Sequence, residues 1–479
     1  MNPPFSTASQ RSSTDPFAYL SLDLLDDVQK LIQLNAADEE SWTWSPGDRE
    51  HWKPAQQAWQ AFTSKWQDAT EIGVLDEHNS LVLDISPIDR LFATAMPRIL
   101  VRDCYQEAYA HVWYQALVFR DRGVIFTGEP GTGKSLFLWY LLVCLLQKRQ
   151  VVLLNLESKS PLLFYHGRVY TAQSCSSLPE TSCGFIWSLL DPHSGSSPPG
   201  STDGPVFPVQ ASTPDEDLYR EWRIRREALL TAFPLWSREE VDKGLRLQWG
   251  YPKFMERLRG LVENWPGQQP SETRCTLAFP YNGIRALLQK CCADQGVTSP
   301  SSAEDAFRFL LDAVIQHFGR APRDVYFGLM DFTSLDISYR EAQPWWCDQL
   351  RDIVTARAQY QRHLEAADYV ICMVPESKVG EPVRWTFDFK SPVMARRVVE
   401  LLVERESEDK IREMVSSFSS LPSGVNGKPL AKWFSRHSFD MNAVEVALYS
   451  IGDVDAPPLS STSMKGGAVG RRTREMISL

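Results

Sequence analysis

The sequence has few of the features that mark secreted, membrane-spanning or zinc-binding proteins. Its 9 cysteines are scattered and odd in number, and none forms a C-x-x-C pair, since Cys291 and Cys292 are only an adjacent doublet. This usage indicates free thiols in a reducing compartment and argues against a zinc ribbon. The first ten residues are polar and lack the apolar core of a secretory signal. We therefore expect an intracellular protein, with cytoplasm and nucleus both left open.

Long apolar runs and an excess of basic residues are also missing. The most apolar stretch, residues 136–146, is too short to cross a bilayer about 30 Å thick, so we expect no membrane partner. The net charge of −10 argues against a protein that coats nucleic acid generally, although a local basic face stays open. With 43% hydrophobic and 23% charged residues, the 479-residue chain is expected to be globular, with about two to four domains.

What the sequence does contain is the pattern of a phosphate-binding loop. Residues 128–135 read G-x-x-x-x-G-K-S, directly after the apolar residues 124–126 and directly before an uninterrupted apolar run. A buried strand followed by a buried helix is the context that a P-loop requires. Its glycines let the backbone approach a phosphate chain, and the loop amides and the helix N-terminus direct partial positive charge at the anion. The pattern therefore predicts nucleotide binding.

The loop also predicts which residues contact the nucleotide. Lys134 can reach the β- and γ-phosphates, and the Ser135 hydroxyl can ligate Mg²⁺. The predicted cofactors are therefore ATP and Mg²⁺. The residues expected to contact the nucleotide are Gly128, Glu129, Pro130, Gly131, Thr132, Gly133, Lys134, Ser135 and Leu136.

A P-loop enzyme also needs a carboxylate at the end of a neighbouring strand to hold Mg²⁺. Asp191 ends the apolar run 185–190, and Asp331 ends a second apolar run at 325–330. Asp191 is closer to Lys134 in sequence, and its separation suits one or two intervening strand–helix units. Asp191 is therefore the favoured second metal ligand. The alternatives are Asp331 at the end of a later strand, and an Asp191 that only begins a turn before Pro192.

Residues for ATP hydrolysis are harder to identify. Pro192 follows Asp191, so the common Asp-Glu pair, whose second carboxylate polarises the attacking water, is absent. Glu157, after the apolar run 150–156, is the candidate to approach the γ-phosphate, and with Lys134 and Asp191 it completes the predicted catalytic set. The alternative for Glu157 is a solvated strand end. Ser212 and Thr213 stand where ring-type NTPases often carry a polar γ-phosphate sensor, and a solvated helix face is favoured over an arginine finger for Arg223, Arg225 and Arg226.

Apolar and helical segments alternate around the loop, as in an α/β fold. The pattern predicts strands at 80–85, 150–156, 184–190 and 206–211, a hairpin over 162–171, and short strands at 369–374 and 385–388. It predicts helices at 102–119, 215–230, 239–247, 252–263, 283–292, 303–318, 339–365 and 392–404. The predicted fold is an α/β P-loop NTPase sheet core flanked by helices, with a mostly helical C-terminal region.

Five segments follow from these patterns. They are a disordered tail at 1–15, a helical, Trp-rich N-terminal region at 16–94, the P-loop NTPase core at 95–234, a mostly helical region at 235–445, and a flexible basic tail at 446–479. In the second segment we expect the tryptophans to pack in a core rather than to stack on bases. These residues are Trp42, Trp44, Trp52, Trp59 and Trp66.

The loop and three later stretches resemble one family, and they occur in the same order. Residues 125–142 are similar to the P-loop of the Crinkler and retrotransposon-hot-spot-like (RHS-like) P-loop NTPase family of fungal or oomycete type. Residues 185–191 resemble the family's Walker B strand, and residues 233–240 its Pro-x-Trp-x-x-x-Glu helix start. Residues 249–254 resemble its Gly-Gly-x-Pro-Arg-Tyr segment, with Lys253 in place of the arginine.

The resemblance implies an ATPase of the ring-type or signalling kind, in which Mg²⁺-dependent ATP hydrolysis drives a conformational change. The alternative, favoured by Pro192, is a nucleotide-gated switch or scaffold with little hydrolysis. Because family members often carry a C-terminal nuclease or kinase, the resemblance also implies a nucleic-acid-associated effector system, and it is compatible with self-association or a protein partner. Asp388-x-Lys390 is read either as a nuclease remnant or as an ordinary strand end, with the strand end favoured.

Overall fold

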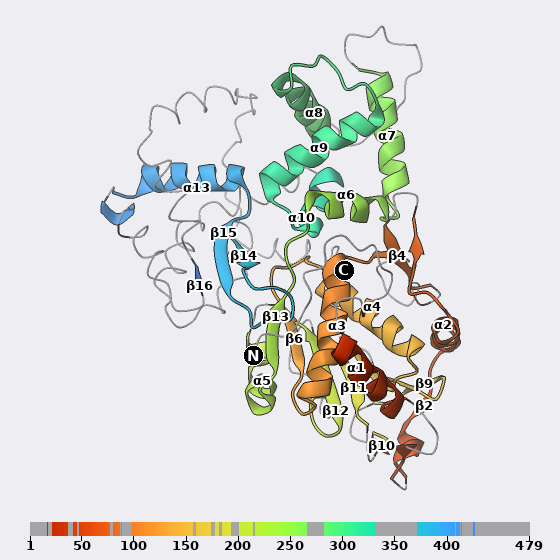
Figure 1. Cartoon of the computed structure of the whole chain (residues 1–479). Helices are drawn as coiled ribbons and strands as arrows, with labels where there is room; N and C mark the ends of the chain where they lie inside the picture. Colours follow the sequence, from red (N-terminus) through yellow and green to blue (C-terminus); the bar gives the residue numbers. More distant parts are fainter. Residues whose placement is uncertain are drawn as a thin grey trace, which may run out of the picture.

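The computed structural model describes residues 17, 22–36, 42–45, 47–76, 80–86, 88, 98–156, 160–173, 178–181, 184–192, 201–213, 216–265, 282–330, 337, 371–407, 409–411, 413 and 425–426. Its centre is a mixed eight-stranded sheet in the order β13-β6-β12-β11-β7-β8-β9-β2. The strands are β2 (Lys53–Pro54), β6 (Val124–Thr127), β7 (Val152–Leu156), β8 (Leu162–Tyr165), β9 (Arg168–Thr171), β11 (Ile186–Asp191), β12 (Val206–Ala211) and β13 (Leu229–Ala232). The protein is therefore α/β, and Figure 1 shows this sheet in its lower half.

Five neighbouring strands of this sheet, β13, β6, β12, β11 and β7, run parallel. Strands β8, β9 and β2 continue the sheet antiparallel. Because parallel strands point the same way, the carboxyl ends of β6, β12 and β11 lie along one edge of the sheet. Open α/β sheets bind their ligands outside this edge. The chain leaves that edge into the glycine-rich loop after β6, into Ser212 after β12 and into Pro192 after β11.

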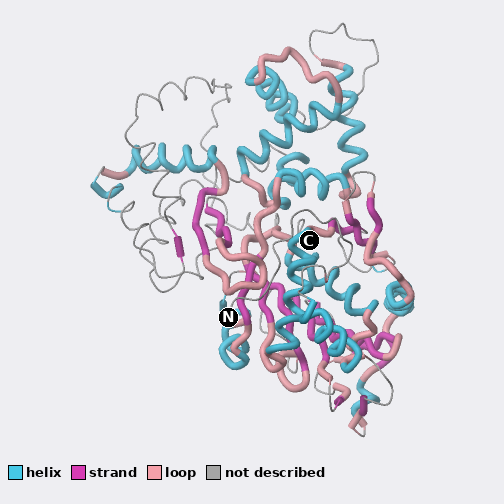
Figure 2. The backbone as a smooth tube through the Cα atoms, in the orientation of Figure 1, coloured by secondary structure: helices cyan, strands magenta, loops and turns pink. Residues whose placement is uncertain are grey.

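Helices cover both faces of the parallel strands, as continuous apolar strands require. Helices α3 (Asp103–Val118) and α4 (Lys134–Gln147) lie over one face of the sheet (Figure 2). Helix α1 (Leu22–Leu34) packs against α3, and α2 (Gln57–Gln67) packs against α4 and the strand β9. Helix α4 is apolar almost all round, which is the composition of a helix buried between layers. On the opposite face, Ile125 packs against Trp222 of α5 (Arg220–Arg226), which follows the short 3₁₀ helix η3 (Glu216–Leu218).

The N-terminal region contributes short strands as well as helices. β1 (Trp42–Thr43) pairs with β10 (Glu180–Thr181), and the 3₁₀ helix η1 (Asp48–His51) follows β1 in the chain. An antiparallel sheet is formed by β3 (Val74–Leu75), β4 (Leu81–Asp84) and β5 (Arg98–Leu100). The predicted packing role of the tryptophans is confirmed, since Trp42, Trp52, Trp59 and Trp66 are buried. Trp59 also stacks on Trp139 of α4, with ring centroids 6.2 Å apart.

The C-terminal part is built around a second apolar core. It contains helices α6 (Arg238–Arg246), α7 (Tyr251–Glu263), α8 (Asn282–Asp294), α9 (Ala303–Phe318), α10 (Pro322–Met330) and α13 (Pro392–Arg405), together with β14 (Ile371–Pro375) and β15 (Trp385–Phe389). β14 and β15 form an antiparallel hairpin, and β16 (Val425–Asn426) pairs with β15. Figure 1 shows α6 to α10 beyond the sheet edge at which the glycine-rich loop begins.

Most of the predicted elements are confirmed, but one predicted helix and one alternative strand are wrong. The helix predicted over 215–230 ends at Arg226, and β13 follows it because Glu227 takes the left-handed conformation (φ 49°) and turns the chain along β6. The run 325–330, which the alternative to Asp191 would make a strand before Asp331, is part of helix α10, which begins at Pro322 and buries Val325 and Leu329 one turn apart. A strand ending at Asp331 is therefore wrong.

Several predictions lie outside the described residues. These are Asp331 itself, the helix at 339–365 and both predicted tails, 1–15 and 446–479. The domain boundaries stay predictions. Within the described ranges, no helix combines the length and the apolar character needed to cross a membrane.

Candidate functional site

The loop at 128–135 joins β6 to α4 and contains three glycines with positive φ. Gly128 has φ 124°, Gly131 φ 82° and Gly133 φ 91°, values at which an L side chain is strained. Gly133 is the N-cap of α4, so the positive end of the helix dipole lies at the loop. The ammonium of Lys134 donates to the carbonyl oxygens of Gly128 and Glu129, both at 2.9 Å, and thereby closes the loop.

The second feature of the site is a contact between the loop and the end of β11. The Ser135 hydroxyl lies 3.1 Å from Asp191 Oδ1, although the two residues are 56 positions apart in the sequence and β12 separates their strands. Asp191 is the last residue of β11 and is 8% exposed. A hydroxyl and a carboxylate are hard oxygen donors of the kind that Mg²⁺ prefers. The structure therefore brings the two predicted metal ligands together.

Two polar residues follow β12, between the strand of the loop and the strand of Asp191. Ser212 is 2% exposed, its amide donates to the Phe126 carbonyl at 2.9 Å, and its hydroxyl has no hydrogen-bond partner among the described residues. The Thr213 carbonyl accepts from the Thr127 hydroxyl at 3.0 Å. Both predicted sensor positions thus lie at the loop edge, and Ser212 offers a buried, unsatisfied hydroxyl there.

The remaining predicted residues are not brought to this site. Glu157 lies outside the described residues, directly after β7. Arg225 and Arg226 lie at the opposite edge of the sheet, where Arg225 pairs with Asp203 at 2.6 Å and Arg226 donates to the Val206 carbonyl at the start of β12. An arginine finger acting within this chain from either residue is therefore wrong. Arg225 lies on an exposed helix face, as favoured, whereas Arg226 is half-buried and binds backbone carbonyls.

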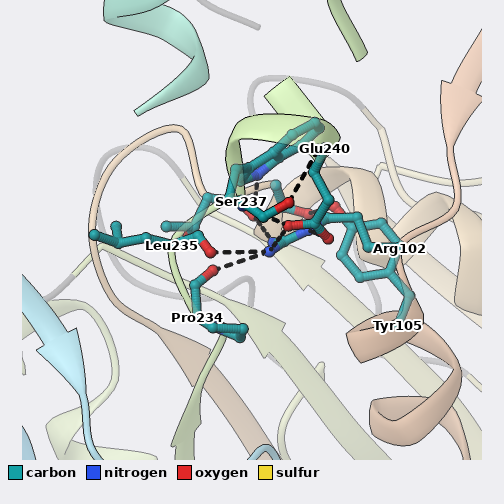
Figure 3. A network of polar contacts seen from close by, with 9 residues as sticks. Arg102, Tyr105, Pro234, Leu235, Ser237 and Glu240 are labelled. Atoms are coloured by element: carbon teal, nitrogen blue, oxygen red, sulfur yellow. Dashed lines mark hydrogen bonds and ion pairs between the residues drawn. The ribbon is translucent and has the colours of Figure 1, made fainter. Parts of the chain in front are cut away.

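A set of buried donors fixes the loop carbonyls from the side of α3 and α6 (Figure 3). Arg102, just before α3, donates to the Thr132 carbonyl at 2.9 Å, and the indole of Trp236 donates to the same oxygen at 3.0 Å. The Tyr105 hydroxyl donates to the Gly133 carbonyl at 2.7 Å. These bonds point the loop carbonyls toward the protein interior, which leaves the opposite side of the loop backbone for an anion.

Arg102 also connects the loop to the first turn of α6. Its side chain is 1% exposed, and its guanidinium binds both carboxylate oxygens of Glu240, at 2.8 and 3.1 Å. It donates further to the carbonyls of Pro234 and Leu235, as Figure 3 shows. Glu240 at the same time closes a capping box with Ser237, so one carboxylate serves both the helix start and Arg102. This set of residues is called the Arg102 network below.

The C-terminal part also contacts the loop, at Gly128 and Gly131. A Cβ added to Gly128 would lie 3.5 Å from the Trp385 ring of β15, and one added to Gly131 would lie 3.4 Å from Cβ of Arg323 in α10. Glu129 is buried here, and its Oε2 accepts from the amide of Met373 at 3.3 Å. Burial raises the pKa of the Glu129 carboxyl, and the nearby Lys390 ammonium opposes that rise.

Sequence reasoning missed the residues that hold the loop from outside it. Arg102 and Glu240 are 138 residues apart, so no local pattern joins them. The available signal was Ser237-x-x-Glu240, a capping-box spacing that marks a helix start. Among the described residues, no three His, Cys, Asp or Glu side chains cluster as a metal site. The Ser135–Asp191 pair instead suits a cation that completes its shell with phosphate and water.

Comparison with known proteins finds a partial relationship. The chain is 28% identical over 186 residues to Crinkler effector protein 15 of Phytophthora infestans, which covers 35% of this chain and 30% of that protein. The same identity holds over 186 residues of Crinkler effector protein 16 of that organism, covering 29% of its length. The chain thus spans about a third of the curated relatives it matches, and the relationship is Crinkler-like. No family model and no solved structure matches.

Proposed function

We propose that this chain is a P-loop NTPase that binds Mg²⁺–ATP at residues 128–135. The observation that carries the proposal is the 3.1 Å contact between Ser135 and Asp191, because it places a carboxylate beside the loop serine across an intervening strand. The positive φ angles of the loop glycines and the strand–loop–helix context give independent support. The Crinkler-like relationship supports assigning this nucleotide-binding unit to an effector of that kind.

In this proposal each residue of the site has a separate role in binding the nucleotide. The loop amides and the α4 N-terminus hold the phosphates, and Lys134 supplies the positive charge that reaches them. Ser135 and Asp191 hold Mg²⁺, which would neutralise charge on the β- and γ-phosphates. Ser212 hydrogen-bonds near the terminal phosphate, which satisfies its buried hydroxyl. The Arg102 network keeps the loop carbonyls turned away from the phosphates.

We further propose that bound ATP is hydrolysed and that hydrolysis drives a conformational change. The second candidate is a nucleotide-gated switch that binds ATP and turns it over very slowly. One observation favours the switch: Pro192 occupies the position next to Asp191 where a water-polarising glutamate commonly stands. Both candidates share the same binding site, so a binding assay alone does not separate them.

The test combines ATP binding and steady-state turnover for wild-type protein and Lys134→Ala. Lys148→Ala, an exposed lysine at the other end of α4, is the matched control. We expect Lys134→Ala to weaken ATP binding about 10- to 100-fold, the scale of one charge-assisted contact, and Lys148→Ala to leave it unchanged. Intact affinity in Lys134→Ala would show that the loop assignment is wrong. If wild type binds ATP but turns over no faster than Lys134→Ala, the switch stands and the ATPase fails.

A further inference from the structure

Lys390 is a buried lysine that the proposed function does not use. It follows β15, and its side chain is 4% exposed. Its ammonium lies 3.3 Å from Glu129 Oε1 in the phosphate-binding loop and 3.1 Å from Asp324 Oδ2 in the first turn of α10. Both carboxylates are themselves largely buried. One cation therefore joins the loop, the helical part and the β14–β15 hairpin.

Because the three charges are buried, loss of this contact would cost free energy. A buried carboxylate without a partner is strongly disfavoured, and removing one member of a buried ion pair leaves the other uncompensated. Glu129 lies inside the loop itself, between Gly128 and Pro130, so an uncompensated charge there would act directly on the loop backbone. Lys390 and the Met373 amide are the described groups that offset this charge from the C-terminal part.

The hairpin that carries Lys390 is itself attached to the central sheet. The Val383 amide donates to the Leu230 carbonyl at 3.0 Å, and the Gly380 amide donates to the Thr231 hydroxyl at 2.9 Å, both on the edge strand β13. Beyond the lysine, the Ser391 hydroxyl donates to the His317 carbonyl of α9 at 2.6 Å. The hairpin thus lies between the nucleotide-binding edge and the helices. A shift of the loop would therefore change the contacts of the hairpin with β13 and with α9.

We propose that Lys390 is a positioning residue of the nucleotide site, which holds the loop to the hairpin through Glu129 so that ATP binding and hairpin docking are linked. The proposal rests on ATP binding at the loop. Linkage is reciprocal: a docked hairpin favours the binding-competent loop, and bound ATP strengthens docking. The lysine of Asp388-x-Lys390 is therefore engaged with the loop and with Asp324, which leaves it unavailable to an external phosphodiester.

The test uses Lys390→Met, Glu129→Gln and the double variant in the full chain. Lys378→Met, an exposed lysine of the same hairpin connection, is the control. We expect Lys390→Met to weaken ATP binding about 5- to 150-fold, the usual range of coupling between sites. Adding Glu129→Gln should restore part of that loss, because it removes the uncompensated charge inside the loop, while Asp324 still lacks the Lys390 ammonium. A lost packing contact would not be rescued by changing the acid, so a double variant as weak as Lys390→Met overturns the proposal.

Hydrogen exchange of residues 371–389 supplies the second readout. We expect ATP to slow this exchange in wild type and in Lys378→Met, and to have a much smaller effect in Lys390→Met. Equal protection by ATP in all three proteins overturns the proposal even if affinities differ. Should Lys390→Met fail to fold, Glu129→Gln replaces it: the link then predicts that ATP no longer protects the hairpin, and undiminished protection overturns it.

Failure of this proposal can be told apart from failure of the proposed function. If wild-type protein does not bind ATP, the proposed function fails, and nucleotide-free exchange of residues 128–135 still tests the link. Faster exchange there in Lys390→Met than in Lys378→Met supports it, and equal exchange overturns it. If wild type binds ATP and Lys390→Met binds equally well, the P-loop function stands and the Lys390 link falls.

Discussion

Replacing Arg102 or Glu240 tests whether the Arg102 network sets the shape of the phosphate-binding loop. Arg102→Met removes the bidentate contact to Glu240 and one of the two donors to the Thr132 carbonyl, while it keeps an aliphatic side chain of similar length. Glu240→Gln is the milder change, because glutamine also serves at this position of a capping box. Arg102→Lys keeps the charge but loses the planar fork.

The structure sets the size of each effect. Breaking a buried ion pair from one side costs about 3–5 kcal/mol, and Arg102, 1% exposed, meets that condition. Glu240 is 26% exposed, so water offsets part of its loss, and Arg102 keeps its carbonyl acceptors in Glu240→Gln. We therefore expect about 4 kcal/mol of destabilisation for Arg102→Met and about 2 kcal/mol for Glu240→Gln, with Arg102→Lys between them.

The assay measures three properties of each variant. These are the free energy of unfolding in urea, the hydrogen exchange of the loop, and the ATP affinity of the folded protein. Glu239→Gln is the control, since this neighbouring carboxylate in the same helical turn is solvent-exposed and makes no contact with Arg102, so it should change these properties much less than Arg102→Met does. Arg102→Met should lower ATP affinity and speed exchange of residues 128–135 under native conditions. If Arg102→Met matches wild type in both stability and affinity, the network does not shape the loop and the reasoning is refuted.

Three further outcomes are expected. Gly133→Ala should abolish ATP binding, because its Cβ would collide with the Tyr105 hydroxyl at φ 91°; retained binding would contradict the described loop. Ser212→Ala should change stability by less than about 0.5 kcal/mol, since its hydroxyl is unpaired, yet lower ATP turnover; unchanged turnover removes Ser212 from the site. Burial lowers the pKa of His111 from 6.5 to about 4, so the unfolded chain binds the extra proton between these values. Stability should therefore fall by about 3 kcal/mol as pH drops from 6.5 to 4, and His111→Gln should flatten that slope in urea titrations.

The sequence was sufficient to predict the parts of the site that are local or follow from strand direction. The loop, its glycine conformations and α4 are encoded by adjacent residues, so periodicity and glycine spacing identified them. The position of Asp191 beside the loop follows from one general fact, that the carboxyl ends of parallel strands lie at the same edge of a sheet. The tryptophans of the N-terminal region were likewise predicted to pack, because burial is the usual use of their area.

The sequence was insufficient where tertiary contacts override local preference. Residues 229–232 continue an apolar run after a charged helix, and only the left-handed turn at Glu227 and pairing with β6 make them a strand. The apolar residues of 325–330 fit the two-residue repeat of a strand and the 3.6-residue repeat of a helix equally well. Pro322 at the helix start and packing in the second apolar core select the helix. The Glu129–Lys390 and Arg102–Glu240 pairs join distant segments, which no single-sequence pattern can indicate.

The central claim is that Ser135 and Asp191 hold the magnesium ion of a bound nucleotide, and its most direct test is the Mg²⁺ dependence of ATP affinity. In wild type, adding Mg²⁺ should tighten ATP binding, and in Asp191→Ala and Ser135→Ala this tightening should be largely lost. Asp203→Ala, a carboxylate at the opposite edge of the sheet, should behave as wild type. A Mg²⁺ effect that is undiminished in Asp191→Ala would contradict the account.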